Sequence, residues 1–402
     1  MTNTRPARAP AVNAPLVVTG PGAIREAARL ASQLSGGQGQ RARVVQVVGP
    51  TFQARTWAPR VSEALAGLRP TLAVHDGPVT PGSVAALAGE LRAACADVVV
   101  AVGGGTVLDA AKSAAALAPA GPVDAGQVAA ACAAPQPGSD PASQVAVIAV
   151  PTTAGTGAEV TPFATLWDLA SSRKLSLRGA KLRPRAAILD PQLLAGLSRA
   201  ELATGLLDTV CQGAEASWSI RSTKVSRKWG THAVVLAAHA LDRVRDGDVD
   251  TAVLATLQRA GHCSGRAIAV AQTSSCHAIS YPLTLRLGLA HGHACGVSLG
   301  RMLLFNSAVR PDDCGDPRGP GHVRAVLGRL AQALGGTAGQ AAARVESFLR
   351  ACDLARLDDL PLDHRGVAAD ALSYPRCGDN PRRLDRESLR RLLGGAADTE
   401  QT

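Results

Sequence analysis

Aromatic residues are scarce in this chain, where phenylalanine, tryptophan and tyrosine together make up 2% of the 402 residues. Nucleic-acid-binding proteins usually stack bases on aromatic side chains beside clustered basic residues. The net charge is +10, but the basic residues gather mainly in segment 171–185, with smaller groups at 221–228 and 381–391. A small anionic molecule explains these groups at least as well, so nucleic acid is not expected as a partner.

Long apolar runs and cysteine pairs are also missing. No run reaches the about 18 residues that a membrane span needs. Residues 1–14 contain basic residues and proline without the apolar core of a secretory signal, so we expect a flexible tail. The nine cysteines include no CxxC pair, and their number is odd. This pattern predicts reduced, mostly buried thiols in a cytoplasmic enzyme that does not enter a membrane.

The first half of the chain alternates short apolar runs with helix-like segments. Runs such as "ARVVQVVGP", "DVVVAVGGG" and "QVAVIAVPTT" are bounded by glycine or proline, which predicts a parallel sheet covered by helices. After about Pro191 the strand signals stop. We therefore predict an α/β, Rossmann-like dinucleotide-binding domain over 15–192 and an all-α domain over 193–402, with the active site between them. Residues 118–143 are expected to form a surface insertion.

Two polar loops follow strands in the first half. In "VVVAVGGGTVLDAAK" (98–112), three glycines let the backbone approach phosphate, and the next helix offers free N–H groups. The segment is neither GxGxxG nor a Walker A motif, yet its position predicts a pyrophosphate loop. Asp109 and Lys112 follow, for which a surface ion pair is the simplest interpretation. The second loop, "PTTAGTGAEVTPFATL" (151–166), is interpreted as a ribose or nicotinamide contact or as an ordinary turn.

The segment "GLLDTVCQGAEASWS" (205–219) has helical periodicity and raises the question of a metal site. Asp208 and Gln212 stand four residues apart and therefore share one helix face. An acid and a second donor at this spacing can hold a metal ion. From these residues alone, a metal site, an altered metal site and ordinary helix surface all remain open.

Several motifs in register resemble the iron-containing (group III) alcohol dehydrogenase family over about residues 14–394. They are "GGGTVLDAAK", "PTTAGTGAEVT", "DPQLLAGLS", "GLLDTV", "HAISYPLTLRLGLAHGHA" and the tail "SYPRCGDNPRRLDRESLRRLL". Within the family, "SWSIRST" and "HAISYPL" are most similar to the phosphonoacetaldehyde reductases of phosphonate biosynthesis. The resemblance implies a dehydroquinate synthase-like architecture, a helical metal-binding second domain and a homodimer or larger homo-oligomer.

The resemblance implies that NAD(P) binds along the two polar loops. The residues implied are Gly103, Gly104, Gly105, Thr106, Asp109, Thr152, Thr153, Thr156 and Lys174. Cofactor choice is set after the second strand, where a carboxylate would bind the 2′-hydroxyl and repel a 2′-phosphate. Gly49 stands where NAD-preferring relatives carry aspartate, with Thr51 and Arg55 nearby. We therefore expect NADPH in preference to NADH.

The resemblance also implies metal ligands from a pair four residues apart on one helix and from two histidines fourteen apart. Asp208, His277 and His291 fit, with His291 expected in a turn and His293 outside the ligand set. Gln212 stands where the family usually has histidine. An amide oxygen is a weaker donor than imidazole for Fe(II) or Zn(II), so weaker metal retention is expected. Three ligands still leave an open position.

Together these inferences predict a reductase of a small anionic aldehyde, which the resemblance identifies as phosphonoacetaldehyde, giving 2-hydroxyethylphosphonate. The expected chemistry is polarisation of the carbonyl by a divalent ion, Fe(II) or Zn(II), and hydride transfer from NADPH or NADH. Tyr281 would bind substrate, pass a proton or pack. Candidates for the substrate anion are Arg178, Lys181, Arg221, Lys224 and Arg286. Two alternatives remain: a sugar-phosphate cyclase or dehydroquinate synthase-like lyase, and a non-catalytic cofactor-binding relative with a decayed metal site.

Overall fold

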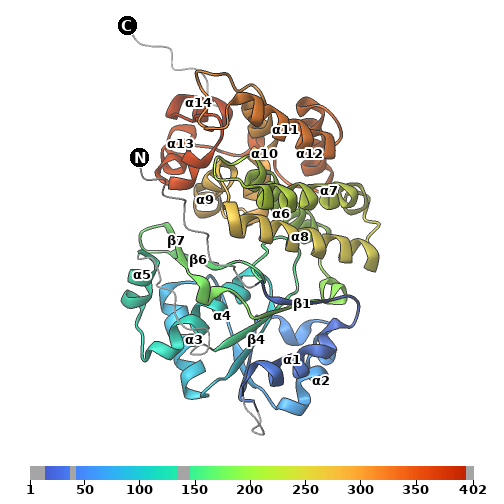
Figure 1. Ribbon diagram of the computed structural model, residues 1–402, viewed down its shortest axis with the longest axis vertical. Coiled ribbons are helices and arrows are strands. Elements are labelled where there is room, and N and C mark those ends of the chain that lie inside the picture. The colour runs from blue at the N-terminus through green and yellow to red at the C-terminus, as the bar shows by residue number, and fades with distance from the viewer. Residues whose placement is uncertain (1–13, 37–41, 134–144, 395–402) are drawn as a thin grey trace, which may run out of the picture.

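The computed structural model describes residues 14–36, 42–133 and 145–394 as an α/β part stacked on a helical part (Figure 1). Nearly all of the predicted tail, and the end of the predicted insertion, lie outside the described residues. The predicted domain boundary at 192/193 falls in a short 3-10 helix, η7 (Pro191–Leu194). No helix within the described ranges has the length and apolarity needed to cross a membrane.

A six-stranded sheet forms the centre of the α/β part, and every strand pairing in it is parallel. The strand order is β1-β8-β5-β4-β2-β3. The strands are β1 (Leu16–Thr19), β2 (Val44–Val48), β3 (Thr71–Val74), β4 (Val98–Gly103), β5 (Ala146–Pro151) and β8 (Ala186–Leu189). The predicted parallel sheet is thus confirmed, and burial on both faces explains why its central strands read as continuous apolar runs.

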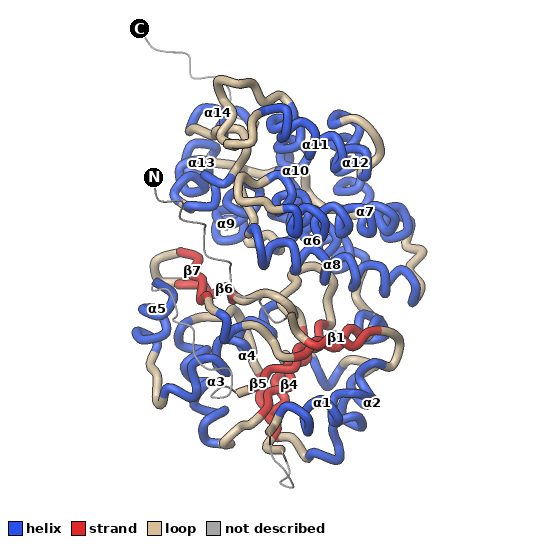
Figure 2. The backbone as a smooth tube through the Cα atoms, in the orientation of Figure 1, coloured by secondary structure: helices blue, strands red, loops and turns tan. Residues whose placement is uncertain are grey.

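Helices cover the two faces of the sheet separately. On β4, Val99 and Ala101 enter the core beneath α3 and α4, whereas residues 98, 100 and 102 enter the core beneath α1 and α2. Figure 2 shows these two helix pairs on opposite sides of the strands. The helices of this part are α1 (Ala27–Leu34), α2 (Ala58–Leu65), α3 (Pro81–Ala93), α4 (Gly105–Leu117) and α5 (Ala125–Ala133). Helix α5 occupies part of the predicted insertion.

The sequence analysis missed an antiparallel hairpin. Strands β6 (Phe163–Asp168) and β7 (Arg173–Arg178) pair along their full length. The predicted basic cluster at 171–185 therefore includes a strand, in which Leu175 and Leu177 alternate with polar residues and pack toward the core. The hairpin packs on α4 and α5 and projects toward the helical part (Figure 1).

The helical part is arranged around α6 (Arg199–Trp218), which is buried on almost every side after its first turn. Ser198 and Glu201 begin this helix with a capping box. The other helices are α7 (Lys224–Asp246), α8 (Thr251–Ala271), α9 (Ser275–Leu287), α10 (His291–Ser307), α11 (Pro320–Ala333), α12 (Ala338–Ala351), α13 (His364–Ser373) and α14 (Arg386–Leu392). Short 3-10 helices lie at η1 (Ala23–Glu26), η2 (Phe52–Ala54), η3 (Ala66–Leu68), η4 (Ala118–Ala120), η6 (Ala180–Leu182), η7 (Pro191–Leu194), η8 (Leu357–Asp359) and η9 (Pro375–Asp379).

The two parts meet through a glycine seam, which we define as the contact of loop 154–157 with α6 and α8. A Cβ atom on Gly205 of α6 would lie 1.8 Å from the carbonyl oxygen of Ala154. A Cβ atom on Gly157 would lie 2.3 Å from the Cα atom of Gly265 in α8. Because no side chain fits between these backbones, the loop after β5 rests directly on both helices.

Candidate active site

A cavity of about 400 Å³ lies between the two parts. Its walls come from the loop between β3 and α3, the start of α4, the loop after β5, the hairpin, helices α6, α8, α9 and α10, and η9. The predicted site residues that line it are Gly105, Thr106, Asp109, Thr156, Lys174, Arg178, Asp208, Gln212, His277, Tyr281 and His291. Those that do not line it are Gly49, Thr51, Gly103, Gly104, Thr152, Thr153, Lys181, Arg221, Lys224 and Arg286.

The predicted pyrophosphate loop joins β4 to α4. Gly104 is the N-cap of α4 and has no side chain that could cap it, so the first N–H groups of the helix face outward. The neighbouring loop packs closely, because a Cβ atom on Gly105 would lie 2.6 Å from Cγ2 of Thr156. The N–H of Thr152 donates to the carbonyl of Gly103 at 3.0 Å. The two polar loops therefore form one surface at the carboxyl edge of the sheet.

The interpretation of Asp109 and Lys112 as a surface pair is wrong. The Lys112 side chain is fully buried, and its Nζ lies 2.9 Å from Oδ1 of Asp109. Nζ also donates to the carbonyl oxygens of Ala158 and Phe163, at 3.0 and 2.7 Å. The N–H of Thr165 donates to Asp109 at 2.8 Å. The pair therefore fastens α4 to the loop after β5 and to the hairpin.

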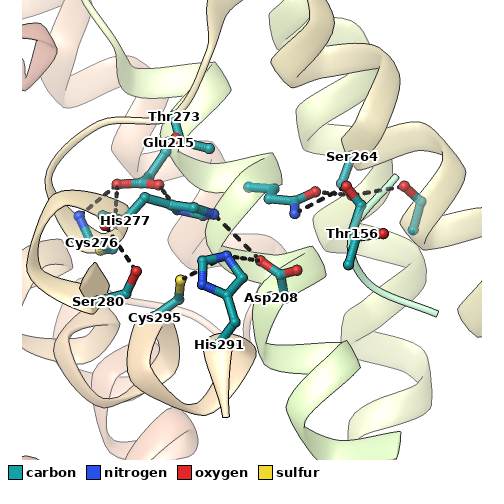
Figure 3. Close-up of polar contacts among 12 residues, drawn as sticks. Thr156, Asp208, Glu215, Ser264, Thr273, Cys276, His277, Ser280, His291 and Cys295 are labelled. Carbon is teal, nitrogen blue, oxygen red and sulfur yellow. Dashed lines mark hydrogen bonds and ion pairs between the residues drawn. The ribbon is translucent and has the colours of Figure 1, made fainter. Parts of the chain in front are cut away.

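Three predicted metal ligands converge at the other side of the cavity (Figure 3). Oδ1 of Asp208 on α6 lies 3.4 Å from Nε2 of His277 on α9 and 3.9 Å from Nε2 of His291 on α10. His291 is the first residue of α10, so the prediction that it lies in a turn is wrong. His293 instead places Nε2 2.7 Å from the carbonyl of Ala355, away from this group.

Glu215 orients His277, and sequence reasoning missed it. Its fully buried carboxylate accepts a hydrogen bond from Nδ1 of His277 and another from the N–H of Cys276 at 2.6 Å. Ser274 Oγ donates to the same carboxylate at 3.1 Å. With its Nδ1 proton held in this way, His277 turns Nε2 toward Asp208, and Nε2 is the nitrogen that could bind a metal ion. Glu215 lies seven residues after Asp208, two turns along one helix face, and this spacing was the available signal.

Gln212 lines the site, but its amide is engaged. Ser264 Oγ donates to Oε1 of Gln212 at 2.8 Å, and Nε2 of Gln212 donates to the carbonyl of Thr156 at 3.4 Å. The side chain is 3% exposed. Gln212 therefore links α6 to α8 and to the loop that carries Thr156.

The converging side chains carry opposite charges. Burial opposes ionisation of Asp208, but His277 and His291 hold the pKa of this carboxyl below its ordinary value. Burial also opposes protonation of His277, yet Cys295 and Glu215 raise its pKa well above the usual range. The two histidines likewise outweigh burial at Cys295 and lower the pKa of this thiol to about 7.

These residues fit a divalent cation. Oδ1 of Asp208 is buried and makes no hydrogen bond with the described residues, although buried polar groups normally have partners. A carboxylate oxygen facing two imidazole nitrogens is a common donor set for zinc and related ions. Asp208, His277 and His291 would hold such an ion in the wall of the cavity.

Three basic side chains, which we call the basic group, line the cavity: Lys174, Arg178 and Arg376. They lie beside Asp208, His277 and His291, which we call the metal-ligand group. The guanidinium of Arg376 in η9 and Nζ of Lys174 in β7 lie 5.5 and 5.3 Å from the ring centre of Tyr281. Arg178 donates to Oε1 of Gln272 at 2.9 Å. Burial lowers the pKa of Lys174 well below its ordinary value, and Arg376 and Arg178 lower it further. Two guanidinium groups and an amine gathered in one cavity favour an anionic ligand, which would compensate their charge.

Arg376 was not among the predicted residues, although the tail motif contains it. The remaining predicted basic residues lie elsewhere. Arg286 pairs with Asp370 at 2.6 Å on the surface, and Arg221 lies 4.0 Å from Asp379. Lys181 in η6 and Lys224 at the start of α7 do not reach the cavity wall.

Two family models match nearly the whole chain. Residues 14–191 match "Iron-containing alcohol dehydrogenase", and residues 202–396 match "Fe-containing alcohol dehydrogenase family, C-terminal". The chain therefore belongs to the iron-containing alcohol dehydrogenase family, as its sequence predicted. It is an NAD(P)-dependent dehydrogenase or reductase, and the alternative of a lyase on the same scaffold is not favoured.

Among individual relatives, the chain is 65% identical over 379 residues to the phosphonoacetaldehyde reductase of Streptomyces viridochromogenes, covering 94% of this chain and 96% of that protein. It is 32% identical to the probable alcohol dehydrogenase EutG of Salmonella typhimurium over 58% of each chain. In fold it is similar to the sulfoacetaldehyde reductase of Bifidobacterium kashiwanohense in complex with NAD+, with a TM-score of 0.81, 23% identity and coverage of 96% and 98%. It is also similar in fold to a 1,3-propanediol oxidoreductase, with a TM-score of 0.80, 21% identity, and coverage of 95% of this chain and 98% of that one.

Proposed function

We propose that this protein reduces phosphonoacetaldehyde to 2-hydroxyethylphosphonate with NADPH. The observation that carries the proposal is that one cavity holds both the metal-ligand group and the basic group. An aldehyde that ends in a phosphonate needs both, because its carbonyl must be polarised while its charge is neutralised. The high identity to a phosphonoacetaldehyde reductase along nearly the full length of both chains supports this substrate.

Different residues of the cavity have different roles in this proposal. Asp208, His277 and His291 would hold a divalent cation, which supplies Lewis-acid polarisation of a carbonyl when bound. Arg178 and Arg376 would bind the phosphonate oxygens, because guanidinium groups match such oxyanions in geometry. Burial raises the pKa of Tyr281, so its phenol keeps its proton and can donate a hydrogen bond to the substrate.

The test compares phosphonoacetaldehyde with an uncharged aldehyde of similar size. Arg376→Ala should raise KM for the phosphonate at least about tenfold, the equivalent of one lost charge-assisted hydrogen bond, and should leave KM for the uncharged aldehyde unchanged. Arg329→Ala is the control, because this exposed arginine of α11 lies outside the cavity. Absence of NADPH oxidation with added Fe(II), Zn(II) or Mn(II) would refute the reductase, and turnover without net NADPH oxidation would indicate a lyase.

The preference for NADPH is tested at Gly49, which follows β2. A Cβ atom there would lie 3.5 Å from Val107, an ordinary contact distance, so a side chain fits. Gly49→Asp should lower kcat/KM for NADPH relative to NADH, because its carboxylate would repel a 2′-phosphate. A parent enzyme that already uses NADH far better than NADPH would contradict the preference.

We also propose a cytoplasmic homo-oligomer, most simply a dimer. All nine cysteines lie in the described part of the chain and are free thiols, as expected for a reducing compartment. The edge strand β1 exposes Leu16 and Val17, and exposed edges with apolar side chains favour association. Light scattering of the purified protein measures the number of subunits.

A further inference from the structure

We propose that Cys295 is a ligand of the same divalent cation, together with Asp208, His277 and His291, and that this donor set selects zinc. The inference rests on the proposed function, because it concerns the ion at that site. It assigns a coordinating role to a residue that sequence reasoning left among nine unremarkable cysteines.

The first argument is distance. Cys295 lies four residues after His291 on α10, so both side chains leave the same helix face. Its Sγ lies 3.9 Å from Nε2 of His291, and the four potential ligand atoms all lie within 4.8 Å of one another (Figure 3). Zinc bonds of about 2.0–2.3 Å place neighbouring ligands of a tetrahedron about 3.3–3.8 Å apart. The observed spacing is therefore close to that of a loaded site and needs only a small contraction.

The second argument is the buried carboxylate of Asp208. Its Oδ1 makes no hydrogen bond with the described residues, and it faces Nε2 of His277 at 3.4 Å and Nε2 of His291 at 3.9 Å. These separations are longer than those of ordinary hydrogen bonds, so the coordination of the oxygen is incomplete. The same oxygen faces the imidazole nitrogens of both histidines, so a cation among these atoms would complete its coordination.

The third argument concerns Gln212, the predicted fourth donor. Its Oε1 accepts from Ser264 and its Nε2 donates to the carbonyl of Thr156. If the amide were rotated by 180°, its oxygen would face the carbonyl oxygen of Thr156, and two acceptors would repel each other. The amide oxygen is therefore held away from a ligand role, and the sulfur of Cys295 is the remaining donor at the cluster.

Donor chemistry determines the expected metal. Thiolate is a soft ligand, and sites that combine thiolate with imidazole favour zinc over ions that prefer oxygen ligands. Cys211 and Cys276 are also buried, but neither belongs to the group of close ligand atoms formed by the described residues. Position at the cluster, rather than burial, therefore distinguishes Cys295.

The experiment measures metal binding without catalysis. The purified full-length protein is stripped of metal and loaded with Co(II), and its near-ultraviolet spectrum is recorded. A thiolate-to-cobalt charge-transfer band is expected in the parent, in Cys211→Ala as the matched control, and not in Cys295→Ser. Zn(II) retention against a chelator should fall at least about tenfold in Cys295→Ser, since even indirect ligand support is worth that much.

A second variant separates the ligand from general damage to the fold. Gln212→His places an imidazole four residues after Asp208 on the same face of α6. Added to Cys295→Ser, it should restore Zn(II) retention without restoring the cobalt band. A band in that double variant, or in Cys295→Ser alone, would overturn the role of Cys295 while leaving the reductase proposal intact. A parent protein that binds neither Co(II) nor Zn(II) would overturn the role of Cys295 and the selection of zinc, whereas the reductase proposal is overturned only by absence of NADPH oxidation with Fe(II), Zn(II) and Mn(II).

Discussion

Replacement of Glu215 by glutamine should weaken metal binding through the protonation of His277. Oε1 of Glu215 receives hydrogen bonds from the N–H groups of Cys276 and His277 and from Ser274 Oγ, at 2.6, 3.4 and 3.1 Å. Because three donors point at this position, it must stay an oxygen in Glu215→Gln. The amide nitrogen is then forced to the second position, opposite Nδ1 of His277.

The size of the effect follows from the tautomer. An amide N–H facing Nδ1 makes that nitrogen an acceptor and moves the imidazole proton to Nε2. Nε2 is the atom that faces Asp208, and a protonated nitrogen cannot bind a metal ion. Loss of comparable supporting groups lowers metal affinity about 10–100-fold, which corresponds to about 1.4–2.8 kcal/mol.

Chelator competition with Zn(II) or Co(II) measures the affinity, and denaturant unfolding of the metal-free protein verifies that the fold survives. Glu201→Gln is the matched control, since this residue lies in the first turn of the same helix and glutamine preserves a capping box. A Glu215→Gln protein that folds normally and binds metal within about twofold of the parent would refute the proposed orientation of His277.

Two further substitutions probe packing around the site. A Cβ atom at Gly292 would lie 1.9 Å from the carbonyl oxygen of Thr204. Gly292→Ala should therefore push α10 from α6, lower the free energy of unfolding by about 1–3 kcal/mol through overpacking, and weaken metal retention. The control is Gly328→Ala at an exposed helical position, which should be neutral or stabilising by up to about 1 kcal/mol. Equal effects of the two changes on the free energy of unfolding would contradict this reasoning. Lys112→Met should lower the free energy of unfolding by about 1–3 kcal/mol, because Asp109, whose side chain is 17% exposed, loses its cationic partner and keeps only the N–H of Thr165. A loss below about 1 kcal/mol in denaturant unfolding would show that this pair does not support the fold.

Local patterns carried the prediction of the sheet, because the strand "DVVVAVGGG" is buried on both faces and its apolar run was readable. Asp208, His277 and His291 were predicted from the family resemblance, since the residues alone left the metal site open. The start of α10 could not be predicted, because "AHGHACG" is rich in glycine and resembles a turn. These glycines instead allow close packing, since a Cβ atom at Gly296 would lie 2.9 Å from the side chain of Leu207. Tertiary contact therefore overrode local propensity.

The residues that sequence reasoning missed are those brought together by the folding of distant segments. Arg376 meets Lys174 and Tyr281 only because η9 and the hairpin reach the same cavity. Cys295 lies four residues after His291, a spacing that places both on one helix face, but the segment was predicted to be a turn and the spacing was not used. No periodicity connects Arg376 to Lys174 and Tyr281, so a one-dimensional pattern could not identify that contact.

The glycine seam limits how this protein can be recombined with its relatives. Gly205 and Gly265 on the helices face Ala154 and Gly157 on the loop, and each contact excludes a Cβ atom. A chimera that takes residues up to η7 from one family member and the helices from another must therefore inherit small residues on both sides of this contact. A chimera in which a larger residue replaces one of these small residues on either the loop or the helices will not form this contact.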